Sequence, residues 1–346
     1  MKTTVKISDG SVTVSYEQQI CSRCVLPESF PGVAFGDNGE CSYCRDEAER
    51  IGVDRQLIDT TIAAAKDAAR DAHYDALVLY SGGKDSSLAL VTVIELGLRP
   101  LAFTLDNGFL SNETSRNVGN VLDALDVDHV RFRPPAGLMK KLYRTSLSIE
   151  FGDDTIKYAT GGCGSCISMV LASAMRTAAA HRIPLLIGGW TPGQLTTSPV
   201  VDQAFLTDVM VRHFVPLGQQ SRPLYDSLRG WHPDHLDVSG MRLPNPLYAS
   251  DYSEQQTLDA LAELGWRKPA DTDSCSTNCR LNGLLILDHI KRFGFHPYVY
   301  ELAHHVRIGA ASRANALAKI SELNINSAQV DAVAGDLGIP SILTRG

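Results

Sequence analysis

The sequence predicts an α/β protein built around a parallel sheet. From residue 76 onward, short apolar runs alternate with segments whose apolar residues recur at helical spacing. Such alternation implies parallel strands joined by helices that cover both faces of the sheet. Composition agrees, because 44% of the 346 residues are hydrophobic and 21% are charged, as is usual for a globular enzyme.

The expected elements follow in chain order. Residues 1–20 alternate weakly, as a short hairpin would, and residues 200–246 are mixed and rich in proline. Strands are expected at 76–80, 100–105, 129–132 and 184–187. Helices are expected at 51–72, 86–96, 112–125, 140–151, 167–181, 253–264, 281–293, 310–323 and 329–337. We expect three domains, namely an N-terminal ribbon (1–50), the α/β domain (51–235) and a mostly helical C-terminal region (236–346).

The charge balance favours a small-molecule substrate over tRNA. The net charge is −7 and the isoelectric point is near 5.8, whereas a chain that binds nucleic acid by its overall field is usually basic. No apolar stretch reaches the ~18–20 residues of a membrane span, and the N-terminus has no signal-peptide core. We therefore expect a cytoplasmic protein with reduced thiols and no membrane partner. A homodimer is left open.

A turn rich in glycine and hydroxyl groups follows the first strand, where residues 80–87 read YSGGKDSS. Ligands of open α/β sheets bind beyond the carboxyl ends of the strands, and the amides that begin a helix favour an anion. Gly82 and Gly83 allow the backbone to approach a ligand closely. Hydroxyl donors come from Ser81, Ser86 and Ser87, and Lys84 adds a positive charge. Asp85 would repel phosphate unless a cation lies between them, so Mg²⁺ is expected.

The six residues SGGKDS resemble the pyrophosphate loop (PP-loop) of the N-type ATP pyrophosphatases, whose pattern is SGGxDS. The resemblance implies a PP-loop (HUP-like) core and an enzyme that splits ATP between its α and β phosphates. In that superfamily a substrate oxygen becomes adenylated, and a nitrogen or sulfur nucleophile then displaces AMP. Lys84 and Asp85 are the catalytic candidates of this loop.

The same resemblance implies further nucleotide contacts. In the superfamily the second strand usually lies under the adenine, and residues 102–108 read AFTLDNG. The candidates there are Phe103, Thr104 and Asp106. A later glycine-rich strand end matches IGGWTPGQ at residues 187–194, which implies that Gly188 and Gly189 lie beside the nucleotide.

Four of the eight cysteines have the spacing of a zinc ribbon. Cys21, Cys24, Cys41 and Cys44 form two C-x2-C pairs separated by sixteen residues. Each pair places two thiolates on one side of a tight loop, and two pairs complete a tetrahedron. A closed four-thiolate site leaves no position for chemistry. We expect zinc here, with a purely structural role.

The remaining cysteines belong to the expected ligand end of the sheet. Cys163 and Cys166 stand in GGCGSC at the start of an expected helix, where thiolates are stabilised. They indicate a redox pair or an iron–sulfur anchor. Cys275 and Cys279 stand in TDSCSTNC, just before another expected helix.

A PP-loop, a C-x-x-C about eighty residues later and one more cysteine about a hundred residues beyond resemble the iron–sulfur-dependent tRNA thiolases. That likeness implies a [4Fe–4S] cluster on Cys163, Cys166 and Cys279, with Cys275 as the alternative third ligand. Three protein thiolates suit a cluster with one exchangeable iron position. The implied activity is ATP-dependent sulfur transfer, which requires a sulfur donor.

A second likeness competes with the first. Residues 21–45, CSRCVLPESFPGVAFGDNGECSYCR, resemble the start of the N-acetyl sugar amidotransferases, and the likeness extends over residues 20–195. It implies ammonia from a glutaminase partner in place of sulfide. A non-catalytic nucleotide sensor is the third hypothesis. The expected cofactors are ATP, Mg²⁺, Zn²⁺ and, for sulfur transfer, the [4Fe–4S] cluster.

Overall fold

The computed structural model describes residues 2–8, 10–46, 54–135, 137–191, 193–194, 198–232, 240–248, 253–273 and 275–343. The two expected domain boundaries, near residues 50 and 235, lie outside these ranges, as do residues 51–53 of the first expected helix. The division into three domains therefore stays a prediction.

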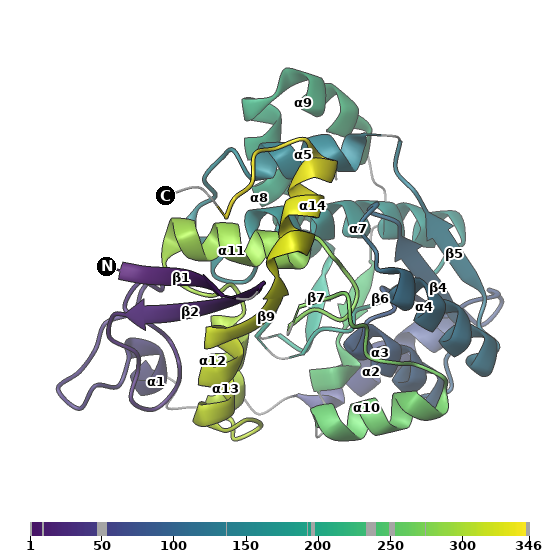
Figure 1. Ribbon diagram of the computed structural model, residues 1–346. Coiled ribbons are helices and arrows are strands. Elements are labelled where there is room, and N and C mark those ends of the chain that lie inside the picture. The colour runs from purple at the N-terminus through teal and green to yellow at the C-terminus, as the bar shows by residue number, and fades with distance from the viewer. Residues whose placement is uncertain are drawn as a thin grey trace.

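The chain folds as a mixed α/β protein with a mostly parallel central sheet (Figure 1), which confirms the predicted fold class. In spatial order the strands of this sheet are β5 (His129–Phe132), β4 (Pro100–Leu105), β3 (Ala76–Leu79), β6 (Leu185–Ile187), β8 (Arg242–Pro244) and β7 (Val200–Asp202). Only β7 runs antiparallel to its neighbour, β8. The first strand of the alternation, β3, thus lies at the middle of the sheet, between β4 and β6.

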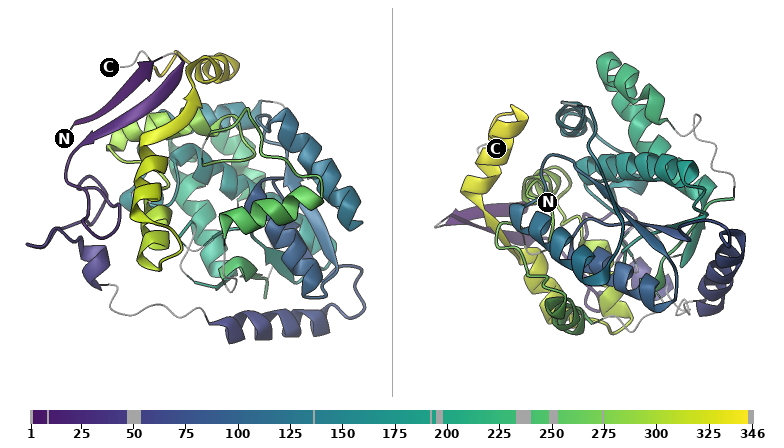
Figure 2. Two further views of the ribbon diagram at one scale, coloured as in Figure 1. Left: turned by 60° about the horizontal axis from the view of Figure 1, so that its bottom comes forward. Right: turned by 90° about the vertical axis from the view of Figure 1, so that its right-hand side faces the viewer.

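Helices cover both faces of the sheet, as the views in Figure 2 show. Successive side chains of a strand point to opposite faces, and β3 divides accordingly. Leu77 and Leu79 join a core with α7, whereas Ala76 and Val78 join a core with α2, α3 and α4. The helices in the first half of the chain are α1 (Ser42–Asp46), α2 (Arg55–Ala68), α3 (Lys84–Glu95), α4 (Asn112–Leu125), α5 (Leu138–Ser146), α6 (Asp153–Ile156) and α7 (Gly161–Ala180).

The chain's two ends meet in a second, smaller sheet. The predicted hairpin is confirmed as β1 (Lys2–Ser8) and β2 (Ser11–Glu17), and β9 (Glu322–Asn326) pairs antiparallel with β2. Figure 1 shows β9 beside the hairpin. The later helices are α8 (Gln203–Gln220), α9 (Arg222–Leu228), α10 (Glu254–Glu263), α11 (Asn282–Phe293), α12 (Val299–Arg307), α13 (Arg313–Ser321) and α14 (Ser327–Leu337).

Several elements differ from the expectation, among them α8, α12 and β9. The helix α8 occupies part of the region that reads as mixed, and it contains Pro216 in its interior. The nine-residue helix α12 was not expected. Residues 322–326, placed partly in a helix by the sequence pattern, form β9 with alternating burial, because pairing with β2 outweighs local helix propensity.

By length and composition, α7 could cross a membrane. This differs from the expectation that no apolar stretch reaches that length. In the fold, however, α7 contacts β3, β4 and β6. Its buried side chains include Met169, Leu171 and Met175. An apolar helix packed on a sheet can have the same length and composition, and α7 is packed in this way.

Candidate functional site

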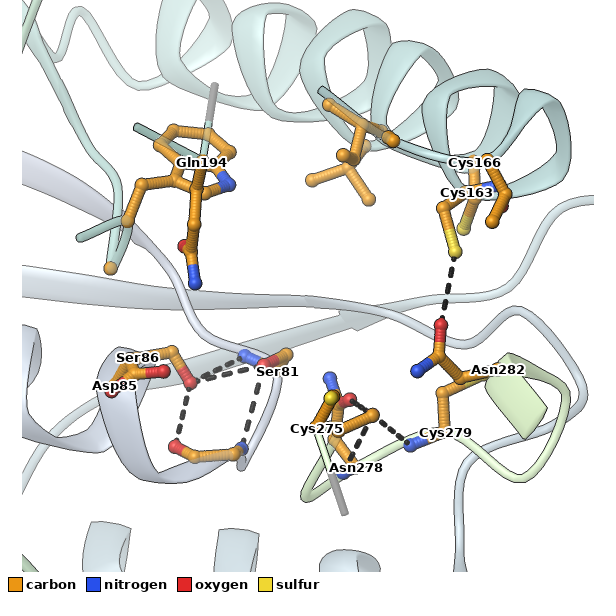
Figure 3. A pocket seen from close by; sticks show the side chains of 18 of the residues that line it. Ser81, Asp85, Ser86, Cys163, Cys166, Gln194, Cys275, Asn278, Cys279 and Asn282 are labelled. Atoms are coloured by element: carbon orange, nitrogen blue, oxygen red, sulfur yellow. Dashed lines mark hydrogen bonds between the residues drawn. The ribbon is translucent and has the colours of Figure 1, made fainter. Parts of the chain in front are cut away.

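The SGGKDS turn lies at the carboxyl end of β3 and begins α3 (Figure 3). Two of its serines, Ser81 and Ser86, are hydrogen-bonded to each other. The Ser81 amide donates to Ser86 Oγ at 3.2 Å, and the two hydroxyl oxygens are 3.1 Å apart. The Ser86 hydroxyl also donates to the Gly83 carbonyl at 3.1 Å. These bonds fix a tight loop whose side chains face one cavity.

Glycine is required at two positions around this loop. Gly82 has a φ of +76°, and a Cβ there would lie 2.5 Å from Val118 Cγ2. A Cβ on Gly189, at the end of β6, would lie 2.6 Å from Ser86 Cα. The buried Trp266 side chain donates to the Gly82 carbonyl at 3.0 Å. The loop is therefore held from several sides by segments far apart in sequence.

Lys84 and Asp85 form an ion pair inside the cavity wall. The Lys84 ammonium lies 2.7 and 2.8 Å from the two carboxylate oxygens of Asp85. The Lys84 amide donates to the Thr277 hydroxyl at 3.0 Å. Anion-binding groups and a C-terminal segment thus meet at the start of α3.

Strand β4 presents alternate side chains to the cavity. Phe103, Leu105 and Asn107 line it, but Thr104 and Asp106 do not. The Thr104 hydroxyl donates to the Tyr80 carbonyl at 2.6 Å, and Asp106 is paired with Arg131 at 3.0 Å. Of the three candidates on this strand, the structure places only Phe103 at the cavity. The strand's period of two explains the difference.

The other expected nucleotide-side residues divide in the same way. Ser81, Gly83, Lys84, Asp85, Ser86 and Gly189 line the cavity, and Gly82, Ser87 and Gly188 do not. Ser87 is fully buried behind the loop. Gly82 contributes by its backbone conformation, as described above.

A C-terminal segment completes the cavity. Residues 275–279 lie across from α7 in Figure 3, and their backbone is tied to the end of β4. The Ser111 amide donates to the Asn278 carbonyl at 3.0 Å, and the Arg280 amide donates to the Phe109 carbonyl at 3.0 Å. Leu110 and Cys279 form an isolated antiparallel bridge. Residues far beyond the PP-loop in sequence thus form part of the same site.

The cysteines of the chain's middle and C-terminus meet at this cavity. Cys163, Cys166, Cys275 and Cys279 all line it. Cys163 and Cys166 lie within the first two turns of α7, where the Thr160 side chain caps the helix by accepting from the Cys163 amide at 3.0 Å. The Asn107 amide nitrogen lies 3.9 Å from Cys166 Sγ and 3.5 Å from Cys279 Sγ. One side chain therefore reaches the sulfurs of two distant segments.

Burial favours the protonated thiols of Cys163, Cys166 and Cys279 by raising their pKa values. It raises the pKa of Cys166 to about 11, an effect that the Tyr143 hydroxyl and the Asn107 amide partly offset. Burial likewise raises the pKa of Cys163 and of Cys279. A bound metal would favour the thiolate forms instead.

A polar network supports the cysteines from α11. The Cys163 thiol donates to Asn282 Oδ1 at 3.4 Å, and the Tyr298 hydroxyl donates to the same atom at 3.3 Å. The Asn282 amide donates to Asp273 Oδ2 at 2.9 Å. Asp273 Oδ1 accepts from the amides of Cys275 and Ser276, both at 2.8 Å. This network fixes both the loop before Cys279 and the side chain that contacts Cys163.

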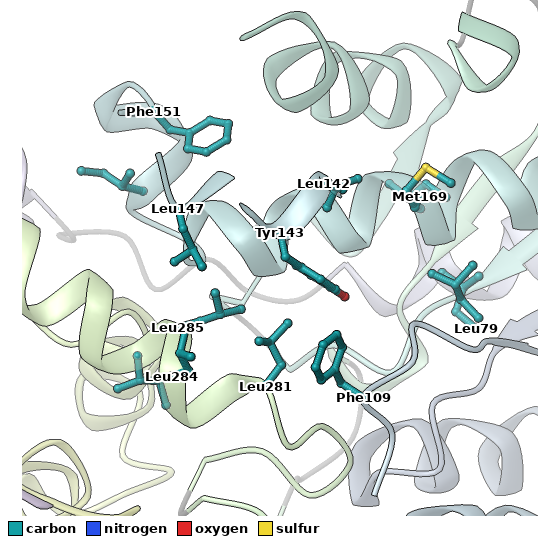
Figure 4. Close-up of a cluster of buried hydrophobic side chains, with 14 of the residues drawn as sticks. Leu79, Phe109, Leu142, Tyr143, Leu147, Phe151, Met169, Leu281, Leu284 and Leu285 are labelled. Atoms are coloured by element: carbon teal, nitrogen blue, oxygen red, sulfur yellow. The ribbon is translucent and has the colours of Figure 1, made fainter. Parts of the chain in front are cut away.

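Apolar side chains close the cavity's inner end. Figure 4 shows Tyr143 of α5 among Phe109, Leu281 and Leu285, and all four are buried in one core. The Phe109 and Tyr143 rings meet edge to face with centroids 5.7 Å apart. The cavity has a volume of about 310 Å³. Its loop end is polar, and its cysteine end borders this core.

A half-buried carboxylate also lines the cavity. Glu301 Oε1, on α12, accepts from the Thr191 hydroxyl at 2.8 Å and from the Gln194 amide at 2.9 Å. Burial raises the pKa of Glu301 to about 7, opposed by the Thr191 bond and reinforced by the negative charge of Asp85. Sequence reasoning did not single out Glu301, because the helix that carries it is short.

The four N-terminal cysteines form a separate group. They are buried, and their sulfurs all lie within 4.8 Å of one another. Cys21 and Cys44 sulfurs are 3.7 Å apart, as are those of Cys24 and Cys41. A tetrahedral ion with metal–sulfur bonds of ~2.3 Å has sulfur–sulfur edges of about 3.8 Å. The predicted metal-binding group is thus confirmed as a four-cysteine site, without fixing which metal it takes.

Aromatic rings join this ribbon to the cavity. Tyr300, which lines the cavity, stacks on Phe30 of the ribbon with centroids 5.7 Å apart and meets Tyr43 edge to face at 5.8 Å. Tyr158, another lining residue, packs edge to face on Tyr300 at 5.4 Å. The ribbon therefore supports one wall of the cavity, although its sulfurs do not line it.

In motif and fold, the chain resembles the N-type ATP pyrophosphatases. A glycine- and serine-rich loop between β3 and α3, at the carboxyl end of a mostly parallel sheet, carries this likeness. No known protein-family model matches the chain. Among curated proteins, the chain is 24% identical over 244 residues to an uncharacterized protein of Methanocaldococcus jannaschii. The matched residues cover 70% of this chain and 71% of the relative.

Two solved structures are similar at low TM-scores. One is described as a predicted subunit of tRNA methyltransferase from Methanocaldococcus jannaschii, with a TM-score of 0.33, 16% identity and coverage of 65% of this chain and 91% of that one. The other is the NMN synthetase of Francisella tularensis, with a TM-score of 0.30, 13% identity and coverage of 73% and 95%. Likenesses of this size decide nothing about the site.

Proposed function

We propose that the protein splits ATP between its α and β phosphates to activate a substrate oxygen, which sulfur then replaces. The observation that carries this proposal is the meeting of Cys163, Cys166 and Cys279 in one cavity with the PP-loop. These cysteines come from segments more than a hundred residues apart, so local geometry does not bring them together.

The PP-loop is the proposed seat of pyrophosphate. Ser81 and Ser86 supply hydroxyl groups, and Lys84 supplies the positive charge. Asp85 is the proposed ligand of Mg²⁺, which would hold the phosphate oxygens beside a carboxylate. Phe103 provides an apolar wall for the adenine at the end of β4.

The proposed reaction has two displacements and no redox step. A carbonyl oxygen of the acceptor attacks the α-phosphorus of ATP, and the bond to the bridging oxygen breaks, so pyrophosphate leaves with the electron pair. A hydrosulfide then attacks the adenylated carbon, and AMP leaves with the acceptor's original oxygen. The PP-loop residues bind the first leaving group, and the cavity keeps both displacements away from bulk water.

The cysteine end of the cavity is proposed to hold an iron–sulfur cluster and not a single ion. Cys163, Cys166 and Cys279 line the same cavity. Among the described residues, only the sulfurs of the N-terminal four cysteines form a group in which all lie within 4.8 Å of one another. A cluster spreads its ligands more widely than one ion does. Cys163, Cys166 and Cys279 would hold it, and Cys275 stays the alternative third ligand. Such a cluster would supply an exchangeable iron position for a sulfur nucleophile.

The N-terminal site is proposed to hold zinc in a structural role. Its four sulfurs are buried, and four protein ligands complete a tetrahedron with no open position. The acceptor is proposed to be a small molecule rather than tRNA, because the net charge of −7 offers no overall attraction to nucleic acid. The sulfur donor is proposed to be sulfide or a protein that delivers it, and the chain is proposed to act in the cytoplasm.

Amidation of an N-acetyl sugar is the competing proposal, which rests on the likeness of residues 21–45. This reaction needs ammonia from a glutaminase, and it does not require the cavity cysteines to act together. The position of Cys279 beside Asn107 and Cys166 therefore favours sulfur. A non-catalytic nucleotide sensor would need neither the thiols nor pyrophosphate release.

The first test is the metal inventory of protein purified without oxygen. Sulfur transfer predicts a brown protein with iron and acid-labile sulfide in addition to zinc. Zinc alone, after reconstitution with iron and sulfide, contradicts the cluster. Zinc with no iron would favour the amidotransferase.

The second test measures pyrophosphate and AMP from MgATP with a panel of acceptors, namely nucleosides, sugar nucleotides and bulk tRNA. Sulfide or ammonium is the added nucleophile. The sulfur proposal predicts a thiolated product only with sulfide, and Asp85→Asn and Ser81→Ala should abolish pyrophosphate release without unfolding the protein. An aminated product would establish the rival. Release of no pyrophosphate with any acceptor would support the sensor.

A further inference from the structure

Glu301 presents one carboxylate oxygen that accepts no hydrogen bond from the residues that the structure describes. Oε1 accepts both of the hydrogen bonds described above, from Thr191 and Gln194. No donor to Oε2 is found among the described residues, and Oε2 is not one of the fully enclosed polar atoms. Since Glu301 lines the cavity, Oε2 is the oxygen available to a bound molecule.

The charges around Glu301 favour an exchangeable proton over a fixed ion pair. Lys84 and Asp85 face it from the start of α3, and the lysine is bound to the aspartate. On α12 itself, His305 lies one turn further along, and burial lowers its pKa to about 4, so it is uncharged near neutral pH. Thr191 and Gln194 contribute uncharged donors. Within the described part of the chain, Glu301 forms no ion pair with a cationic side chain.

A structural role alone does not account for a carboxylate at this position. A glutamine would accept the same two bonds through its amide oxygen, without the free-energy cost of burying a charge. The difference between the two side chains lies in Oε2, the oxygen that accepts no hydrogen bond from the described residues. A glutamate there can take up a proton, and a glutamine cannot.

We infer that Glu301 is a further catalytic residue, the base that accepts the proton lost by the acceptor when its oxygen attacks ATP. The inference rests on the proposed function and adds to it a requirement for the acceptor. The acceptor's reacting group must be a carbonyl with an N–H beside it, as in an amide, a lactam or a cyclic urea.

The protons and electrons of this step balance. As the carbonyl oxygen bonds to the α-phosphorus, the electron pair of the neighbouring N–H bond forms a carbon–nitrogen double bond. The proton moves to Glu301 Oε2, and pyrophosphate leaves with the electron pair of the broken phosphorus–oxygen bond. In the second displacement, hydrosulfide brings its own proton, which returns to the nitrogen as the thiocarbonyl forms. Glu301 loses its proton to solvent when AMP leaves.

The test compares Glu301→Gln with Glu263→Gln, the same change on the exposed surface of α10. Pyrophosphate release is measured with the acceptor found in the panel, and the dissociation constant of MgATP is measured by calorimetry. We expect Glu301→Gln to slow release by about 10²–10⁴-fold with unchanged ATP affinity and melting temperature, and Glu263→Gln to match the wild type. Glu301→Asp should recover part of the rate.

The pH profile separates a base from a positioning group. Wild-type release should rise with pH through a single ionisation near neutrality, because only the carboxylate accepts a proton, and this step should vanish in Glu301→Gln. A rate in Glu301→Gln equal to wild type, or an unchanged profile, overturns the inference and leaves the proposed function standing. If Glu301→Gln does not fold, an Asp variant with wild-type rate and profile overturns it. A wild-type protein that releases no pyrophosphate removes both.

Discussion

The two groups of cysteines differ in how they are packed and in what they face. The N-terminal four are buried with their sulfurs within 4.8 Å of one another, in a ribbon of their own. The cavity cysteines are partly exposed, come from α7 and the segment before α11, and share their space with the PP-loop. The same side chain thus serves a closed site in one region and an accessible one in the other. Enclosure, more than the C-x-x-C spacing, therefore distinguishes the two groups of cysteines.

The largest expected effect is the loss of the N-terminal metal. Cys21→Ser removes one of four ligands, and metal binding contributes on the order of 10 kcal/mol to the folding of small metal ribbons. We expect the loss of one zinc per chain and rapid proteolysis within residues 10–46, measured by elemental analysis and limited digestion. Cys275→Ser, outside this group, is the control. Unchanged zinc content and protection in Cys21→Ser would break the contrast between the two groups.

The next largest effect separates the cavity cysteines from the ribbon. Cys166→Ala or Cys279→Ala should abolish the iron–sulfur absorbance and thiolation while zinc, ATP affinity and melting temperature stay close to wild type. The reason is that these thiols line a cavity and are not part of a closed site. Cys275→Ala should retain the iron. Loss of iron in Cys275→Ala with retention in Cys279→Ala would make Cys275 the third ligand.

A smaller effect is expected from the side chain that contacts two cavity thiols. Asn107→Ala removes the amide beside Cys166 and Cys279, and outer-shell partners of metal ligands typically contribute about 10–100-fold in affinity or activity. We expect iron to dissociate faster in a chelator challenge. Asn120→Ala, whose amide donates to the Gly265 carbonyl on the surface, is the matched control. Equal iron release in the two variants would show that Asn107 does not position the thiols.

The smallest effect concerns the support of the ribbon. The Arg313 guanidinium donates to the Cys21 and Cys24 carbonyls at 2.8 Å. Arg313→Leu should lower the free energy of unfolding by about 1.5–3 kcal/mol, because hydrogen bonds from a charged group are lost. Denaturant titration measures this, and iron content should not change. A loss of cavity iron without loss of stability would mean that the two regions are coupled more closely than their separate packing implies.

Local patterns were enough for most of the fold near the site. The apolar run before SGGKDS and the helical spacing after it predicted β3 and α3, because both depend on neighbours a few residues apart. The strand at 100–105 was predicted as well, but not which of its side chains face the cavity. The sheet decides which face meets the cavity, and it placed Phe103 and Asn107 there instead of Thr104 and Asp106.

Long-range contacts account for what the sequence did not show. Glu301 lies on a helix too short to stand out by its periodicity. Thr277 reaches the PP-loop only because residues 109–111, which follow β4, are joined backbone to backbone with the segment before α11. The strand β9 depends on pairing with a hairpin three hundred residues away. None of these contacts leaves a local pattern.

By itself, the sequence determined the PP-loop, the four-cysteine ribbon and the alternation of strands and helices. Each depends on spacings of a few residues, where backbone geometry translates directly into structure. Only the tertiary structure decided that Asn107, Cys166, Cys279 and Glu301 border one cavity. Their convergence requires the sheet to bring the ends of its strands together and the C-terminal segment to fold back across them. The free energy for that arrangement comes from burying the two cores on either side of the sheet.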